Sequence, residues 1–287
     1  MKPRADASLE TITPIEYAGG IWIKRDDSFN VYGVNGGKVR SCFVLAQESI
    51  GLVTAASRTS PQGHIVAAIA RGLRVPCRLH TASGSRTPEM DRALESGATI
   101  IQHRAGYSSV VQARAREDAA SRDWTLIPFG MESQESLDLT ARQTVNIPGE
   151  TRRIVVPVGS GMTLAGILWG LKSLQRELRV VGVLVGADPT RRLDRWAPSD
   201  WRKRVKFCDS KGDYAKPAPL LSWAGISLDP LYEAKCIPFL QCADCLWIVG
   251  HRGDSAAAMA LNSRYLRTDK VSVEHGMKRG DLGKSRE

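Results

Sequence analysis

The sequence lacks any long apolar run, and no segment reaches the roughly 18 consecutive apolar residues of a membrane-spanning helix. Its first residues, MKPRADASLETITP, have no apolar stretch after the basic ones, so no secretory signal is expected. We therefore expect a cytoplasmic protein without a membrane segment. Hydrophobic residues make up 43% and charged residues 24% of the chain, a balance that excludes wholesale disorder. With 287 residues, the chain can bury the core of one large domain or of two modest ones.

The cysteines are few and follow no disulfide pattern. Six are present, and a cytoplasmic setting would keep them reduced. Cys242 and Cys245 have the C-x-x-C spacing of redox and zinc sites, but no second ligand pair accompanies them. Cys245 also opens the apolar run CLWIV, whereas a redox motif would stand at a helix N-terminus. We interpret both as buried thiols and expect no metal site.

Acidic residues are the minority, with 30 Asp and Glu against 40 Lys and Arg, for a net charge of +10. Such an excess favours anionic partners. Half of it lies in residues 191–206 (RRLDRWAPSDWRKRVK), where seven basic residues face two acidic ones and Trp196 and Trp201 are interleaved. One interpretation is a surface that contacts DNA, neutralising phosphates and stacking bases. The other is a solvated loop with both tryptophans folded inward.

Strand-like and helix-like segments alternate along the chain. A first series has strands at 51–56, 74–80, 98–102 and 124–128, with helices at 62–72, 88–96 and 107–122. A second has strands at 154–158, 180–185 and 245–249, with helices at 163–174, 230–240 and 255–266. The alternation predicts the α/β class: two lobes, each an open, largely parallel sheet flanked by helices, with a ligand in the cleft between them. We assign residues 1–46 and 138–267 to the large lobe, 47–137 to the small lobe, and 268–287 to a mobile tail.

One strand runs through a glycine turn directly into a helix, in the stretch IVVPVGSGMTLAG at residues 154–166. Consecutive N–H groups in such a turn form a nest for an anion, and the helix N-terminus adds positive potential. The hydroxyls of Ser160 and Thr163 can add donors. A tight turn that needs glycine only for its geometry is the alternative.

Two further segments carry groups suited to chemistry. Lys38 follows Asn-Gly-Gly and precedes a helical stretch at 39–47, so the helix dipole disfavours its charged form and favours a nucleophilic amine. In DPLYEAK, at residues 229–235, Asp229 is a natural N-cap and Pro230 a natural first helical residue. Tyr232 and Glu233 then fall in the first turn. A surface lysine and a solvated acidic turn are the plain alternatives.

Taken together, these segments resemble the fold type II pyridoxal-phosphate enzymes, the tryptophan-synthase-β-like superfamily. The nearest similarity is to the branch of 1-aminocyclopropane-1-carboxylate deaminase and D-cysteine desulfhydrase. Its motifs occur here in the same order, as KRDD at 24–27, NGGKVR at 35–40, GSGMT at 159–163 and DPLYEAK at 229–235, with HRG at 251–253 where the family has its late His-Thr-Gly-Gly. The resemblance spans residues 13–253.

The resemblance implies a cofactor, pyridoxal phosphate, and a role for each matching position. Lys38 would form the Schiff base with the cofactor and then serve as the proton-transfer base. Glu233 would face the pyridine nitrogen and favour a protonated ring, and Tyr232 would assist proton transfer or substrate binding. The cofactor phosphate would be held by the loop residues Gly159, Ser160, Gly161, Met162 and Thr163. The resemblance also implies a homodimer.

The substrate loop departs from the family pattern. Where the family has Ser-Asn followed by His or Gln, this chain has SRTSPQGH at residues 57–64. Aligning the histidines puts Gln62 and Gly63 at the Ser and Asn positions, ahead of His64. Alternatively, Ser60 or Thr59 supplies the hydroxyl through a shifted loop. The resemblance thus implies a lyase or deaminase that acts through a Cα carbanion on an amino acid, by deamination, elimination or decarboxylation. Two alternatives stay open: an enzyme for an amino acid attached to a pyrimidine in DNA, and a non-catalytic cofactor-binding module.

Overall fold

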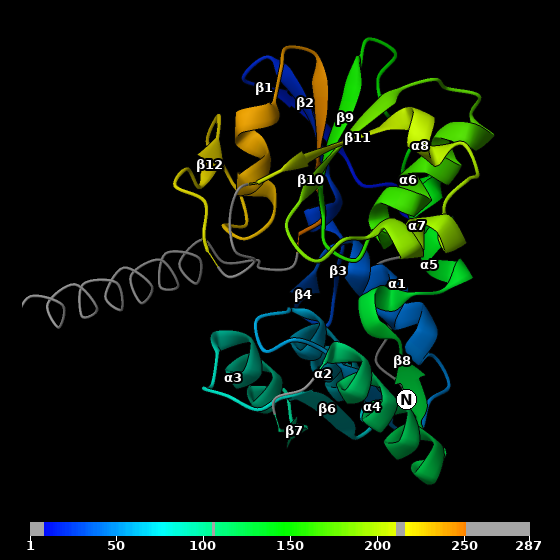
Figure 1. Ribbon diagram of the computed structural model, residues 1–287, viewed down its shortest axis with the longest axis vertical. Coiled ribbons are helices and arrows are strands. Elements are labelled where there is room, and N and C mark those ends of the chain that lie inside the picture. Colours follow the sequence, from blue (N-terminus) through cyan, green and yellow to red (C-terminus); the bar gives the residue numbers. More distant parts are fainter. Residues whose placement is uncertain (1–8, 105–106, 211–215, 251–287) are drawn as a thin grey trace, which may run out of the picture. The chain divides into compact units, whose positions relative to one another are not determined.

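The computed structural model describes residues 9–104, 107–210 and 216–250, which form two sheets flanked by helices (Figure 1). The larger sheet has the order β1-β2-β14-β9-β10-β11, with bounds Ile15–Ala18, Ile21–Arg25, Asp244–Ile248, Arg153–Val158, Arg179–Leu184 and Val205–Asp209. The smaller has the order β7-β6-β5-β8, with bounds Ala98–His103, Cys77–Ala82, Leu52–Ala55 and Thr125–Ile127. All strand pairs in both are parallel except β1 with β2. The predicted α/β class with two parallel sheets is confirmed.

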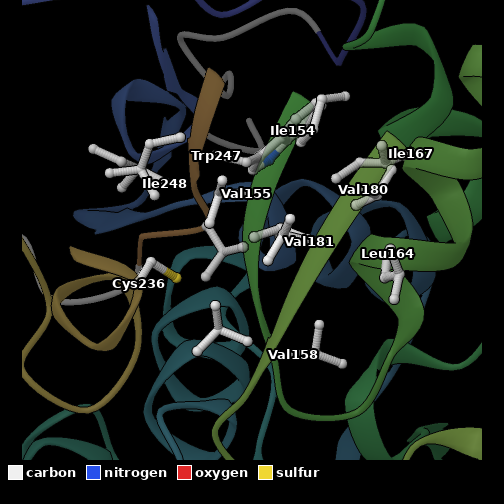
Figure 2. Packing of buried hydrophobic residues seen from close by; sticks show 14 of the residues in the cluster. Ile154, Val155, Val158, Leu164, Ile167, Val180, Val181, Cys236, Trp247 and Ile248 are labelled. Atoms are coloured by element: carbon white, nitrogen blue, oxygen red, sulfur yellow. The ribbon is translucent and has the colours of Figure 1, made fainter. Parts of the chain in front are cut away.

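The core of the larger sheet lies on its central strands. β9, β10 and β14 are almost continuously apolar because helices and loops cover both of their faces. Figure 2 shows Leu164 and Ile167 of α6 (Met162–Ser173) beside Val180 of β10. Helix α5 (Gln134–Arg142) packs on α6, where Gly166 and Gly170 leave no room for a Cβ against α5 and its C-terminal extension.

The core of the smaller sheet is built with α1 (Gly37–Ala46) and α2 (Gln62–Leu73). Val39, Cys42 and Ala46 of α1 belong to this cluster, together with Ile65 and Ile69 of α2. Helices α3 (Pro88–Glu95) and α4 (Ser108–Arg122) complete this part of the fold. The assignment of 1–46 to the large lobe stays a prediction, but α1 contributes its apolar side chains to the core of the small sheet.

Several elements differ from the sequence-based expectation. The helix expected at 230–240 is a 3-10 helix, η3 (Glu233–Phe239), and it begins only at Glu233 because Tyr232 has φ −124° and ψ −93°, outside helical space. The basic stretch expected to be irregular forms α7 (Thr190–Trp196), α8 (Trp201–Arg204) and β11. Cys242 is exposed in the turn before β14, so only Cys245 of that pair is buried. The expected helix 255–266 and the tail 268–287 lie outside the described residues.

The remaining elements are short. They are the 3-10 helices η1 (Asp26–Ser28) and η2 (Phe129–Met131), and two small hairpins of β3 (Asn30–Val31) with β4 (Val34–Asn35) and of β12 (Ser222–Trp223) with β13 (Ile226–Ser227). Among the described helices, none is long and apolar enough to cross a membrane.

Candidate active site

The predicted site residues gather where three neighbouring parallel strands end. β2, β14 and β9 are adjacent in the larger sheet and run in the same direction. After β14 comes the Val249–Gly250 segment, and after β9 comes the Gly159–Thr163 loop. Ligands of open parallel sheets bind at the carboxyl ends of the strands, because loops and helix N-termini converge there.

The start of α1, which carries Lys38, is docked on Val249 and Gly250. The Gly37 N–H donates to the Val249 carbonyl oxygen at 3.1 Å. Gly36 has φ +113°, and a Cβ there would overlap the Gly250 carbonyl oxygen, so only glycine permits this approach. One turn further on, Arg40 forms a buried ion pair with Asp26 at 2.9 Å, which ties α1 to the end of β2.

The Lys38 amine lies in a setting that disfavours its charge. Surrounding protein lowers its pKa from the usual 10.5 to about 8, and the positive charge of Arg192 adds to the effect. A substantial fraction of neutral amine is therefore present just above pH 7, and a neutral amine is the nucleophilic and proton-accepting form.

Glu233 is fully buried and uses one of its two carboxyl oxygens. Oε1 accepts hydrogen bonds from the backbone N–H groups of Val249 (2.8 Å) and Gly250 (3.1 Å). Oε2 is buried and has no hydrogen-bond partner among the described residues. Burial, with a contribution from the negative charge of Asp229, raises the pKa of Glu233 to about 8. A buried carboxyl oxygen without a partner is costly, so Oε2 is suited to a group brought in by a ligand.

The Gly159–Thr163 loop leads from β9 into α6. Gly161, with φ +91°, precedes the first helical residue, so the backbone N–H groups of the loop and of the first turn of α6 form a nest for an anion. The Met162 side chain is buried in the core, which leaves only its backbone for a ligand. Thr163 and Ser160 stay partly accessible.

Tyr232 contacts the Gly159–Thr163 loop, which we call the phosphate-type loop. A Cβ placed on Gly159 would lie 3.3 Å from the Tyr232 hydroxyl oxygen, so the ring lies against the loop. Asp229 fixes the backbone before it, since its Oδ1 accepts from the N–H groups of Leu231 (2.8 Å) and Tyr232 (3.1 Å). The predicted capping role of Asp229 is thus seen, although regular helix begins only at Glu233.

Residues 8–219 of the chain match the family model described as "Pyridoxal-phosphate dependent enzyme". The chain belongs to this family. It is 27% identical over 174 residues to the biosynthetic L-threonine dehydratase of Pasteurella multocida (strain Pm70), an alignment that covers 57% of this chain and 32% of that protein. The same enzyme of Haemophilus influenzae is 25% identical over 219 residues, covering 69% and 41%. The chain thus spans less than half the length of these relatives.

A solved structure of an ACC deaminase homologue has a similar fold. Its TM-score is 0.73 at 21% sequence identity, with 90% of this chain and 96% of that chain covered. At this identity the likeness concerns the fold alone, and it agrees with the two parallel sheets described above.

The residues present fit the cofactor that the family name implies. A phosphate suits the glycine loop at the start of α6, a ring nitrogen suits the unpartnered Oε2 of Glu233, and an aldehyde suits the neutral form of Lys38. The glycine loop follows β9, and both the turn before Lys38 and the Glu233 carboxyl bond to Val249, directly after the neighbouring strand β14. Lys38, Glu233, Gly159, Ser160, Gly161 and Thr163 are therefore the residues that could hold pyridoxal phosphate.

The expected substrate loop differs from its sequence-based reading at Gln62. Gln62 Nε2 donates to Thr54 Oγ1 (2.9 Å) and to the Pro128 carbonyl oxygen (3.0 Å), and its Oε1 accepts from the Gly130 N–H (2.7 Å). Both ends of the amide are engaged, so Gln62 holds the η2 turn and offers no free group to a substrate.

The other loop residues have different surroundings. Gly63 is buried against Leu79, where a Cβ would overlap the leucine side chain. Ser60 is half-buried, and its Oγ accepts from the Gln62 N–H at 3.3 Å, which leaves its own proton to donate. His64 is half-buried on α2. Of the two alternatives, the shifted loop is favoured at Ser60, because its half-buried hydroxyl can still donate.

Sequence reasoning missed the residues that support the phosphate-type loop from outside. Arg192 Nη1 donates to the Ser160 carbonyl oxygen at 2.9 Å, and Gly130 contacts the Ser160 side chain so closely that a Cβ would clash. In the sequence, Arg192 is one of the seven basic residues of the stretch 191–206, which charge alone characterises. No local pattern distinguishes it from Arg191.

Proposed function

We propose that this protein is a pyridoxal-phosphate-dependent enzyme that acts on an amino acid through a carbanion at Cα, with lyase or deaminase chemistry. The observation that carries the proposal is the shared anchoring of two chemical groups. The turn before Lys38 donates to the Val249 carbonyl oxygen and packs closely on Gly250, and the carboxyl of Glu233 accepts from the N–H groups of the same two residues. Mere retention of a cofactor needs neither an amine of lowered pKa nor a partner for the ring nitrogen, so we favour an enzyme over a binding module.

When bound, pyridoxal phosphate supplies an electron sink for the electron pair left at Cα. In the proposed reaction, Lys38 accepts and returns the Cα proton, a task for which a pKa of about 8 is close to ideal near neutral pH. With its own pKa at about 8, Glu233 keeps a proton at neutral pH and can donate it from Oε2 to the ring nitrogen. Tyr232, against Gly159, is in reach of the phosphate end of the site and lines it.

The substrate class follows from the family and from the altered loop. The relatives named above are a dehydratase and a deaminase homologue, which supports elimination or deamination of an amino acid. No observation here favours decarboxylation. We assign the substrate carboxylate to the turn at residues 57–60, where the half-buried Ser60 hydroxyl accepts from the Gln62 N–H and keeps its own proton to donate.

The alternative of a DNA-attached substrate finds little support in the contacts of residues 191–206. Arg192 pairs with Glu132 at 2.9 Å, Arg202 with Asp194 at 2.5 Å and Arg204 with Asp200 at 3.1 Å. Trp201 is buried. Much of the positive charge is thus paired within the fold, as expected of a structural segment.

The test combines cofactor loading with a substrate panel. Purified protein is incubated with pyridoxal phosphate, reduced with borohydride and digested, and the pyridoxyl group is expected on Lys38. The loaded protein is then assayed for ammonia and 2-keto acid with L-threonine, L-serine, D-cysteine and 1-aminocyclopropane-1-carboxylate. Loading without turnover of any amino acid would favour the binding module. DNA binding at low salt that weakens when Arg202, Lys203 and Arg204 are neutralised together would favour the DNA alternative.

A further inference from the structure

A cavity lies between α4, the η2 turn and α7. Its volume is about 230 Å³. Its lining combines apolar side chains, among them Phe129 and Trp196, with the polar side chains of Gln112, Arg116, Glu132 and Arg195. A space of this size is smaller than a typical site for a whole drug-sized ligand, so it suits a single functional group with a short carbon chain.

The charges at this cavity are unbalanced. Arg116 is exposed and has no ion pair with the described residues. The Arg195 side chain is 72% exposed, and its one carboxylate contact within the described part of the chain, with Glu132, is long at 3.6 Å. Glu132 gives its shorter contacts to Arg192 Nε (2.9 Å) and Trp196 Nε1 (2.8 Å). Two guanidiniums at the cavity therefore remain available to an anion.

Glu132 links the cavity to the phosphate-type loop. Its Oε1 faces Trp196 and Arg195 at the cavity, and its Oε2 holds Arg192, which in turn donates to the Ser160 carbonyl oxygen at 2.9 Å. Burial by itself would raise the pKa of Glu132, but hydrogen bonds from Trp196 and Arg192 outweigh it and lower the pKa, so the carboxylate stays charged. An anion that draws Arg195 away leaves the pair of Glu132 with Arg192 intact. Both sites can therefore be filled together.

We propose that this cavity is a second anion subsite, in which Arg116 and Arg195 bind a carboxylate or phosphate group while Phe129 and Trp196 contact the attached carbon chain. It is separate from the residues assigned to pyridoxal phosphate. Guanidiniums are suited to both groups because their planar N–H donors match two oxygens at once. The anion is either the distal group of a substrate or a free effector, and the subsite recognises the same chemistry in both.

The test measures binding by calorimetry to protein loaded with pyridoxal phosphate, so that the glycine loop is filled. The probes are inorganic phosphate, L-serine and O-phospho-L-serine. If the subsite takes a substrate-borne group, O-phospho-L-serine binds at least tenfold more tightly than either L-serine or inorganic phosphate. If it takes a free effector, inorganic phosphate binds and O-phospho-L-serine binds no more tightly than inorganic phosphate. In both cases the double variant Arg116→Ala with Arg195→Ala reduces phosphate-dependent binding at least tenfold.

Matched variants separate the subsite from a general charge effect. Arg114→Ala removes one charge from the same helix, but Arg114 pairs with Glu117 at 2.7 Å and does not line the cavity. It should bind like the parent, and Arg116→Lys should recover part of the lost affinity. Equal binding by the Arg114→Ala and double variants, or no phosphate-dependent binding to the parent, overturns the proposal. Failure of cofactor loading would count against the proposed function, and the same titrations on the unloaded protein would still test the subsite.

Discussion

Lys38 and Glu233 lie on elements that are both hydrogen-bonded to Val249. The Val249 carbonyl oxygen accepts from Gly37, directly before Lys38, and the N–H groups of Val249 and Gly250 donate to Glu233 Oε1. The two groups are 195 positions apart in the chain. A shift of the segment after β14 would therefore move both at once.

Substitution of Lys38 should abolish covalent cofactor attachment without unfolding the protein. In Lys38→Ala the visible absorption of the lysine-bound cofactor and all turnover should be lost, while the far-UV circular dichroism matches the parent. The matched control is Lys172→Ala, which removes an exposed lysine from α6 and should load normally. Label recovered on another lysine in the parent would show that Lys38 has been misassigned.

The rate of cofactor uptake should depend on pH through the Lys38 amine. Only the neutral amine attacks the aldehyde, so the uptake rate should rise with pH through a midpoint near 8, well below the usual lysine value of 10.5. Arg192→Gln removes a nearby positive charge and should move the midpoint upward. Arg191→Gln removes the neighbouring, exposed charge and should leave it in place. Identical midpoints for both variants would exclude Arg192 as a cause.

Glu233 should govern the rate of Cα chemistry more than the retention of cofactor. Glu233→Gln keeps the shape but has no acidic proton to give to the ring nitrogen, so turnover limited by Cα chemistry should fall at least tenfold, or about 1.4 kcal/mol. A substrate deuterium isotope effect on turnover shows whether that step is limiting. An unchanged rate in the presence of such an effect would remove Glu233 from the mechanism.

The stability of the cofactor-free protein should also depend on pH through the protonation of Glu233. Its pKa is raised from 4.5 to about 8 in the fold, so the folded state binds a proton that the unfolded state has already released. The resulting stabilisation is full below pH 4.5 and is lost as the pH rises to about 8. Glu233→Gln should flatten this part of the melting-temperature profile. Glu135→Gln, at an exposed position of α5, should retain the slope of the parent.

Gly36→Ala should disrupt the docking of α1 on the strand end. Its Cβ would overlap the Gly250 carbonyl oxygen, so both stability and cofactor affinity should fall. Gly33→Ala is the matched control, since Gly33 also has positive φ (+82°) but open space around its Cβ position. The control isolates the backbone strain, on the order of 1–2 kcal/mol. Equal melting temperatures for the two variants would show that the close approach at Gly36 is not needed.

Local sequence patterns were sufficient to predict the alternating strands and helices and to show the family-type motifs. Strands such as β5 and β9 and helices such as α2 and α6 were predicted within a few residues, because buried parallel strands are continuously apolar and glycine turns bound them. The order of the four motifs likewise predicted Lys38 and Glu233 as site residues without coordinates. Local pattern carries such information because it depends on periodicity and turn chemistry, which are properties of neighbouring residues.

The hydrogen bonds between polar groups that are distant in sequence are visible only in the three-dimensional fold. The sequence predicts Gln62 near a substrate, yet its side-chain amide forms hydrogen bonds with Thr54, Pro128 and Gly130. Of these three residues, only Thr54 is near Gln62 in sequence. Arg192 was one charge among seven until the fold brought it to Glu132 and Ser160. A hydrogen bond depends on distance and direction in space, and residues 30 to 70 positions apart meet only when the sheets have formed. For the same reason, the unpartnered oxygen of Glu233 and the cavity at Arg116 and Arg195 have no signature in the sequence.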